Sequence, residues 1–338
     1  MANQNTTIRL KDRIKTDLED LYNSGILTFI QQFKNCKIKA AEQLSMDLFG
    51  TSDELSSHGL PGYYTGKRDA KTVMVMLNPG SDVISQDNPF VTEMALERTM
   101  KELGINNPSS SADFVNLFVQ GSNNYGNIDK DDKGNIRIDN FDIKQAAFLK
   151  AWVDRDFTIP NDFPDKLKNL PPRLSKEEKE KINELLRETK QTVLMKKLQL
   201  ELIPYASREF KKVEKEKMHF LFPYVETLFD EIFSKERNYV IFCSDFFDTL
   251  FRMYSDDTGY TGSIVFGDKE EWPFFQNDRK ACCTPIKITY NKGKAMTSIH
   301  AVIAHTFPNK ALPNAYDKMQ KYGELCFECY NDYKKRKP

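Results

Sequence analysis

Cysteine, histidine and tryptophan are scarce in this chain, which holds 6, 4 and 2 of them among 338 residues. So few cysteines cannot form the dense framework of a disulfide-rich secreted domain, and we expect a reduced, cytoplasmic protein. No run of about 18 apolar residues occurs, and no charged-then-apolar leader opens the chain. We therefore expect neither a membrane span nor a signal peptide.

An excess of charge of either sign is also missing, because 49 Lys and Arg face 49 Asp and Glu. This balance argues against a protein that coats nucleic acid through bulk electrostatics, but it leaves room for a local basic groove. The hydrophobic content of 40% can supply a sizeable core. The length predicts about two domains, or one large domain with an insertion.

Short apolar segments alternate with helical patterns along the chain. Helical spacing within residues 1–50 predicts N-terminal helices, and further helices are expected at 219–234, 245–254 and from 315. The segments that favour strands are 72–77, 198–207, 239–244 and 298–305, with short β-like pieces within 261–297. This alternation predicts an α/β fold with a mostly parallel central sheet.

Residues 121–195 have a different character and are interpreted as an insertion into a single α/β domain spanning 1–338. Their first part is rich in Asn, Asp and Gly, a short helix is expected at 144–153, and a charged helix is expected from Ser175. The run DKDDKGNIRIDN lacks the closing Glu of a calcium-binding EF-hand loop, so a surface loop is favoured over a calcium site. A lone CxxC, Cys326 and Cys329, favours helix core over a metal site.

Chemistry-bearing residues follow several of the expected strands. In parallel α/β sheets, ligands bind outside the carboxyl ends of the strands. The candidates at such ends are Asn78, residues 201–205 with Glu201 and Tyr205, Ser244 and His305. Each also has an ordinary structural alternative, since Asn before Pro forms turns and a lone His is often a core residue.

Two segments resemble motifs of a known family. MLNPGSDVISQDNPF (76–90) resembles the first motif of the uracil-DNA glycosylase superfamily, closest to its mismatch-specific thymine and single-strand-selective monofunctional branches. AHTFPNKALPN (304–314) resembles the second motif. The resemblance implies a three-layer α/β/α fold and a monofunctional DNA N-glycosylase, a hydrolase without metal or other cofactor. It implies base flipping from DNA that is single-stranded or locally opened.

The resemblance also assigns roles to individual residues. Asn78 would position water and His305 would donate a hydrogen bond to the departing base. Gly80 would let backbone N–H groups approach the base, Phe90 would stack on it, and Pro79 belongs to the substrate-binding set. Tyr205 and Ser244 complete the expected substrate-binding set. The loop residues expected to wedge into a DNA groove and meet phosphates are Phe307, Pro308, Asn309 and Lys310.

Glu201 departs from the family pattern, which places Asn at the base-reading position. A carboxylate accepts hydrogen bonds but does not donate them, so it would repel a uracil carbonyl and favour an exocyclic amino group. We therefore expect an amino-bearing or modified base as the target, in DNA repair or in defence against phage. If Glu201 faced solvent, this interpretation would fail.

Two further readings stay open at this point. The same pocket could bind a nucleotide or nucleic acid without catalysis, or the motif match could be accidental in an unrelated α/β protein. The glycosylase interpretation adds one electrostatic expectation, a basic groove beside His305.

Overall fold

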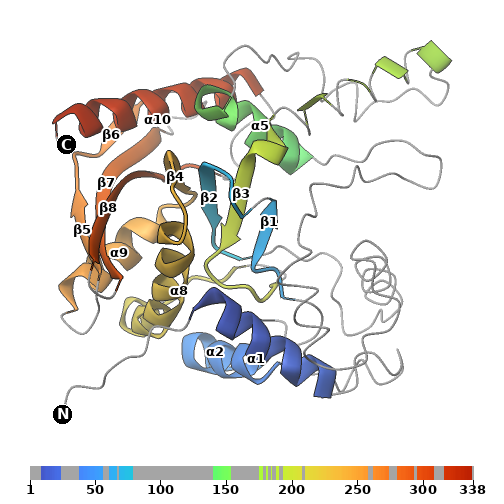
Figure 1. Cartoon of the computed structure of the whole chain (residues 1–338), viewed down its shortest axis with the longest axis vertical. Coiled ribbons are helices and arrows are strands. Elements are labelled where there is room, and N and C mark those ends of the chain that lie inside the picture. Colours follow the sequence, from blue (N-terminus) through green and yellow to red (C-terminus); the bar gives the residue numbers. More distant parts are fainter. Residues whose placement is uncertain are drawn as a thin grey trace.

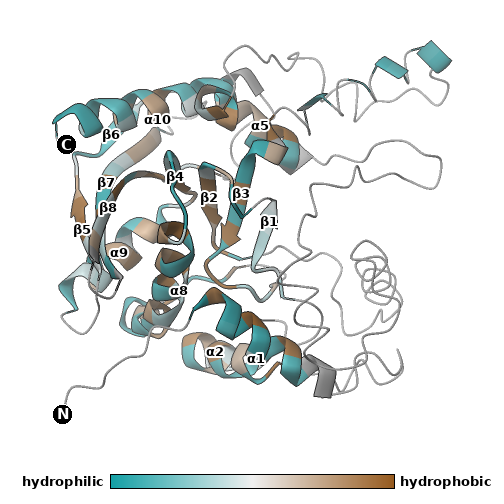
Figure 2. Ribbon diagram, viewed as in Figure 1, coloured by the Kyte–Doolittle hydropathy of each residue, from teal (hydrophilic) through white to brown (hydrophobic). Residues whose placement is uncertain are grey.

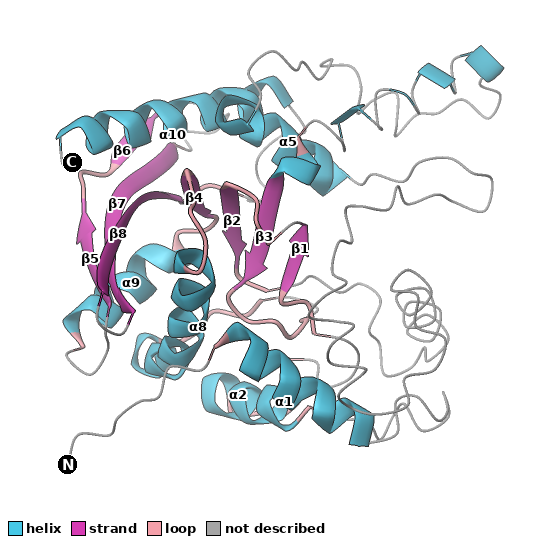
Figure 3. Cartoon of the chain, viewed as in Figure 1, coloured by secondary structure: helices cyan, strands magenta, loops and turns pink. Residues whose placement is uncertain are grey.

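The computed structural model describes residues 9–23, 38–55, 61–66, 68–78, 140–153, 193–207, 210–257, 262–273, 280–292, 295–307 and 316–336, with scattered positions at 175–189. Within these residues the chain folds into an α/β structure in which helices surround one sheet (Figures 1 and 3). None of the described helices is long and apolar enough to cross a membrane.

The strands are β1 (Tyr64–Gly66), β2 (Thr72–Met76), β3 (Lys197–Glu201), β4 (Tyr239–Phe242), β5 (Gly262–Phe266), β6 (Glu270–Trp272), β7 (Ala281–Lys292) and β8 (Ala295–Ala304). The helices are α1 (Leu10–Asn23), α2 (Lys39–Phe49), α5 (Asn140–Val153), α8 (Phe222–Phe233), α9 (Phe246–Asp256) and α10 (Tyr316–Arg336), with 3₁₀ turns η2 (Leu194–Lys196) and η3 (Lys215–Leu221). Helices α1 and α2 lie within the predicted N-terminal helical region, and α5 extends the helix expected at 144–153.

The described strands follow the order β1-β3-β2-β4-β8-β7-β5, with β6 paired to β7. Strands β3, β2, β4 and β8 are parallel neighbours, whereas the pairs that involve β1, β5, β6 and β7 are antiparallel. The sheet is therefore mixed, and the expectation of a mostly parallel sheet is wrong. The parallel half is the part built from the four strands that the sequence predicted.

The antiparallel half is dominated by a long hairpin of β7 and β8. Its register runs from Lys292 paired with Ala295 to Cys283 paired with Ala304. Two antiparallel strands need only a short turn, whereas parallel strands need a long crossover. The sequence predicted only short strands within 261–297, because Pro285 interrupts the pattern of β7. It also predicted that the last strand begins at 298, whereas β8 begins at Ala295.

Helices cover both faces of the sheet, and each face has its own buried cluster. One cluster joins the sheet to α1, α2, α8 and α9, and the other joins it to α5 and α10 (Figure 1). Alternation along β2 shows the division, because Val73 and Val75 belong to the first cluster and Met74 and Met76 to the second. In Figure 2 the central strands are mainly hydrophobic and α10 is mainly hydrophilic.

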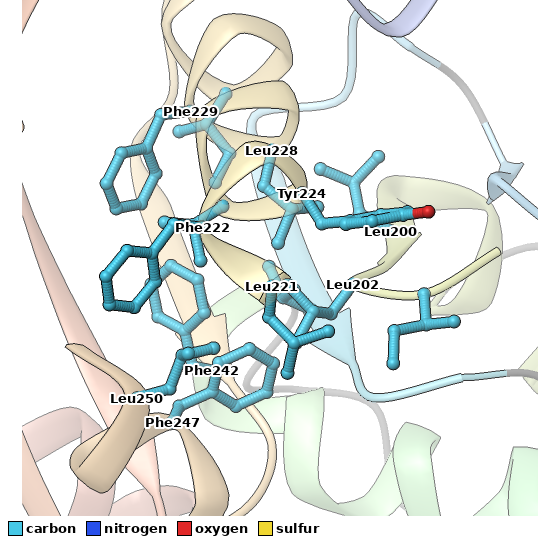
Figure 4. Packing of buried hydrophobic residues seen from close by; sticks show 14 of the residues in the cluster. Leu200, Leu202, Leu221, Phe222, Tyr224, Leu228, Phe229, Phe242, Phe247 and Leu250 are labelled. Carbon is cyan, nitrogen blue, oxygen red and sulfur yellow. The ribbon is translucent and has the colours of Figure 1, made fainter. Parts of the chain in front are cut away.

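The first cluster is rich in aromatic rings. Figure 4 shows four of its phenylalanines, with Phe222 and Phe229 on α8 and with Phe242 of β4 next to Phe247 of α9. The rings of Phe242 and Phe251 meet edge to face, with centroids 4.7 Å apart. Such packing fixes α9 against the sheet and so fixes the start of α9, which lies next to the end of β4.

The second cluster depends on a close approach of α5 to α10. A Cβ atom at Gly323 of α10 would overlap the backbone carbonyl of Phe148 in α5. The Phe148 ring packs on Tyr322, with centroids 5.4 Å apart. Helix α5 is therefore an integral part of the core, although it lies within the region interpreted as an insertion. The remainder of 121–195 lies largely outside the described residues.

Candidate functional site

The carboxyl ends of four parallel strands meet at one edge of the sheet. Strand β3 ends at Glu201, β8 ends directly before His305, and Asn78 and Ser244 each lie two residues beyond the ends of β2 and β4. The sheet order places them in the sequence Glu201, Asn78, Ser244, His305 across this edge. Neighbouring strands are about 4.8 Å apart, so the row spans about 14 Å. We call these residues the strand-end row.

Asn78 is held by two hydrogen bonds from its side-chain amide. Nδ2 donates to the carbonyl oxygen of Tyr205 at 3.3 Å and to Oγ of Ser207 at 2.7 Å. A carbonyl oxygen can only accept, so the amide must turn its nitrogen towards Tyr205. This leaves Oδ1 as a fixed acceptor at the end of β2. Sequence reasoning did not identify Ser207, which carries no motif signal of its own.

Glu201 is buried, with 9% of its surface exposed. Its Oε1 accepts a hydrogen bond of 2.7 Å from Nε2 of Gln199, whereas Oε2 has no partner among the described residues. Burial raises the pKa of Glu201 to about 8, against the lowering effects of Gln199 and Lys197. The condition that Glu201 should not face solvent is thus met, but its carboxyl is mainly protonated at neutral pH.

His305 lies at the other end of the row and contacts strand β7. Its Nε2 is 2.8 Å from Oγ1 of Thr284, and its backbone N–H donates to the carbonyl oxygen of Cys282. Burial lowers the pKa of His305, and the nearby carboxylate of Asp248 raises it in part. The ring is therefore mainly neutral at neutral pH. Thr284 is a second contact residue that the sequence gave no reason to select.

Within the described residues, the cations Arg252 and Lys269 that act on His305, and the neighbouring Lys280, lie against carboxylates. Arg252 pairs with Asp248 at 2.9 Å. Lys269 and Lys280 both pair with Glu271, at 2.9 and 2.8 Å. The basic groove expected beside His305 is therefore not formed by these cations, because each already lies against a carboxylate.

Ser244 secures the start of α9. Its Oγ accepts a hydrogen bond of 3.2 Å from the backbone N–H of Phe246 and lies 3.2 Å from Oδ1 of Asp245. A side-chain oxygen in this position satisfies one of the free N–H groups of a helix N-terminus. Ser244 therefore has a structural role that is independent of any ligand.

The strand-end row divides between the two faces of the sheet. Glu201 shares its face with Lys197 and Gln199, and Lys197 contacts Gln145 of α5. His305 follows Ala304, whose side chain belongs to the α5 and α10 cluster, so alternation directs His305 to the face that carries α9. The electrostatic influence of Asp245 and Asp248 on His305 agrees with this placement. Glu201 and His305 therefore lie at the same edge of the sheet but on opposite faces of it.

Two of the expected site residues turn away from this edge. The Tyr205 hydroxyl donates to Asp17 of α1 at 2.9 Å, so only its backbone carbonyl contributes to the row. Phe307 is buried against Phe148, with ring centroids 5.1 Å apart. In this structure α5 and α10 therefore enclose the Phe307 ring in the core, away from the exposed position expected of a DNA wedge. Pro79, Gly80, Phe90, Pro308, Asn309 and Lys310 lie outside the described residues.

The cysteines of α10 are core residues. Cys326 and Cys329 are buried in the same cluster as Cys283 of β7. Among the described residues, no group of three or more His, Cys, Asp or Glu side chains is arranged to hold a metal ion.

Comparison with known proteins finds no matching family model, no matching curated protein and no matching solved structure. The resemblance of residues 76–90 and 304–314 to glycosylase motifs therefore rests on the sequence alone.

Proposed function

We propose that this protein is a monofunctional DNA N-glycosylase with a uracil-DNA glycosylase-like α/β/α architecture, acting on a flipped base that bears an exocyclic amino group. The observation that carries the proposal is the strand-end row, which brings Asn78 and His305, one residue from each motif segment, to the same edge of the sheet as Glu201. Ligands of α/β sheets bind at such edges.

Asn78 supplies the acceptor that the water needs. Hydrolysis of an N-glycosidic bond passes through a sugar that carries positive charge and a departing base that carries negative charge. The fixed Oδ1 of Asn78 orients a water molecule towards the sugar, and the developing positive charge makes a strong base unnecessary. The resemblance of Asn78-Pro79-Gly80 to the family motif assigns the same role.

His305 stabilises the departing base. When the hydroxyl of Thr284 donates to Nε2, the ring carries its proton on Nδ1 and presents that N–H as a donor. A neutral donor avoids the cost of burying an imidazolium, in keeping with the lowered pKa of the ring. The charge on the departing base strengthens this hydrogen bond as the glycosidic bond breaks.

A base-release assay tests the proposal. The purified chain is incubated with single-stranded and double-stranded oligonucleotides that carry uracil, cytosine, modified cytosines or adenine, and alkali then cleaves at abasic sites. We expect release of an amino-bearing base, with single-stranded or locally opened DNA as the better substrate. Binding without release from any substrate would favour the alternative, a nucleic-acid binding protein that uses the same edge.

Asn78→Ala separates catalysis from binding in the same assay. Loss of the positioned acceptor should reduce turnover by about 10²- to 10³-fold, as for other preorganised polar groups, with little change in DNA affinity. Asn238→Ala is the matched control, because Asn238 is an exposed asparagine at the opposite end of β4. Equal activity of the Asn78 variant and the control would contradict the role of Asn78.

A further inference from the structure

Three polar side chains form a ladder on one face of β3. Lys197, Gln199 and Glu201 alternate with Leu198 and Leu200, which point into the opposite cluster. Lys197 is fully buried, and its Nζ donates to Gln145 of α5 and to Oε1 of Gln199 at 2.7 Å. Lys197 and Glu201 are buried and Gln199 is half-buried, and burying polar side chains costs free energy unless they serve one another or a ligand.

The ladder has a fixed direction. Lys Nζ can only donate, so the Gln199 amide must turn its oxygen to Lys197 and its nitrogen to Glu201. Oε1 of Glu201 consequently accepts from Gln199, and a proton on this carboxyl is placed on Oε2. Oε2 is buried and has no partner among the described residues, at the end of β3, where Glu201 pairs in register with Met76 of β2.

The surroundings of Glu201 favour its neutral form. The charged or titratable groups that act on it are Lys197 on its own strand and the Cys243 thiol at the end of β4, whose pKa burial raises. Strand β2 contributes Met74 and Met76, and α5 contributes the uncharged Gln145. Burial outweighs Lys197 and raises the pKa of Glu201 to about 8.

We propose that burial keeps Glu201 neutral while the Lys197–Gln199–Glu201 ladder orients its carboxyl as a hydrogen-bond donor, with Oε2–H directed to the ring nitrogen that neighbours the exocyclic amino group of a nucleobase. This inference rests on the proposed function and identifies the atoms of the nucleobase that Glu201 contacts. Oε2–H donates to the ring nitrogen, and the remaining lone pair of Oε1 accepts from the amino group. Lys197 and Gln199 are positioning residues, because they act through Glu201.

This arrangement differs from the one expected for a carboxylate. An ionised Glu201 would accept from the amino group but repel the lone pair of the adjacent ring nitrogen. The neutral acid pairs with both atoms, as a side-chain amide does with a donor–acceptor edge. Recognition should therefore weaken as the pH rises through the ionisation of Glu201.

Infrared difference spectroscopy of the free protein tests the ladder without any substrate. The carbonyl stretch of a protonated buried carboxyl, defined by subtraction of the Glu201→Gln spectrum, is followed between pH 5 and pH 10. We expect the band at neutral pH and its loss near pH 8. Lys197→Met and Gln199→Met should each move that loss to higher pH, because both residues favour the ionised form.

Lys196→Met is the matched control, since the neighbouring Lys196 is exposed and its loss should leave the band unmoved. Thermal unfolding establishes that each variant is folded, and Gln199→Met provides the second test if Lys197→Met does not fold. A carboxyl that is already ionised at neutral pH, or a band that neither variant shifts, overturns the inference.

A binding arm separates this inference from the proposed function. Oligonucleotides carrying cytosine and 3-deazacytosine, which lacks the ring nitrogen acceptor, are compared by base release and by affinity at pH 6.5 and pH 9. We expect a preference for cytosine at pH 6.5 that is reduced at least several-fold at pH 9. Base release without this preference refutes the ladder alone, whereas a protonated Glu201 without release or binding of any oligonucleotide refutes the function.

Discussion

The two ends of the strand-end row reach the same protonation outcome by different means. At the Glu201 end, a buried acid is neutral because burial raises its pKa, and one oxygen has no partner among the described residues. At the His305 end, a base is neutral because burial lowers its pKa, and the ring contacts the hydroxyl of Thr284. The row is thus composed of uncharged hydrogen-bonding groups at neutral pH.

The comparison teaches that burial, more than charge pairing, sets the chemistry of this edge. The ion pairs near His305 lie on the surface and partly cancel one another, whereas Glu201 has no cation in direct contact among the described residues. An edge of neutral donors and acceptors suits the recognition of an uncharged base. The stability contributed by the Glu201 end should therefore fall as the pH rises, whereas that contributed by the His305 end should increase.

The largest expected effect is on the pH dependence of stability at the Glu201 end. The pKa of Glu201 is about 8 in the folded chain and near 4.5 when unfolded, so the folded state binds the proton more tightly. Stability should fall as the pH rises between these values, by up to about 1.4 kcal/mol per pH unit, and level off above pH 8. Glu201→Gln, which stays neutral, should lack this component.

The measurement is urea unfolding of both proteins between pH 5 and pH 9. The stability of Glu201→Gln relative to the parent should increase by about 3 kcal/mol from pH 5 to pH 7.5. A pH-independent difference between the two proteins would show that Glu201 is ionised in the folded state, and the contrast between the two ends of the row would then fail.

The next effect concerns the anchor behind Asn78. The carboxylate of Asp17 accepts hydrogen bonds from the hydroxyls of Tyr63 and Tyr205, and the Tyr205 carbonyl in turn holds Asn78. Asp17→Ala leaves both buried hydroxyls without this partner and should lower the unfolding free energy by about 3 kcal/mol. Glu19→Ala, on the same helix, should cost less than about 0.5 kcal/mol because its pair with Lys15 is exposed.

Asp17→Ala should also reduce base release more than Glu19→Ala does. If Asp17→Ala leaves both the urea midpoint and turnover unchanged, then the anchor does not support the Asn78 end.

The sequence predicted the parallel half of the sheet because its strands are short apolar segments that end at recognisable turns. It located Asn78, Glu201, Ser244 and His305 at strand ends, and all four lie at one edge. It did not predict the long antiparallel hairpin, since Pro285 interrupts the pattern of β7. Strand pairing depends on contacts between distant residues, which periodicity within one segment cannot specify.

The directions of individual side chains were the less predictable part of the site. Tyr205 and Phe307 follow strands as ligand-binding residues do, yet partners from α1 and α5 draw them into the core. The Lys197-Gln199-Glu201 alternation was visible in KLQLE, but only the presence of α5 shows that this polar face is buried. The charge state of Glu201 follows from that burial.

A smaller effect is expected at Thr284. Thr284→Val keeps the side-chain shape and removes the hydroxyl that contacts Nε2 of His305, at a cost of about 1 kcal/mol in stability. The ring loses the contact that selects its tautomer, so base release should fall several-fold. Thr289→Val is the control on the same strand, because its contact with Ser298 is exposed. Unchanged release would separate Thr284 from the function of His305.

The smallest effect tests the charges beside His305. Asp248 raises the pKa of the ring and also pairs with Arg252, which lowers it. Asp248→Asn removes the carboxylate that raises the pKa of His305 and leaves Arg252, which lowers it, without its partner. Both changes should lower the pKa of His305 further. A group whose folded pKa is depressed loses stability as the pH falls. The stability difference between the variant and the parent should therefore be slightly larger near pH 5 than above pH 7, where only the lost Arg252 pair contributes.

The ring titration can be followed by NMR, since the chain holds only 4 histidines. Asp256→Asn, at the far end of α9, removes the same charge from an exposed position and should leave the His305 titration unchanged. A shift of equal size in both variants would mean that His305 senses the net charge of the helix. A shift in Asp248→Asn alone would mean that the end of the row is tuned by its immediate neighbours, in contrast to Glu201, whose ionisation burial controls.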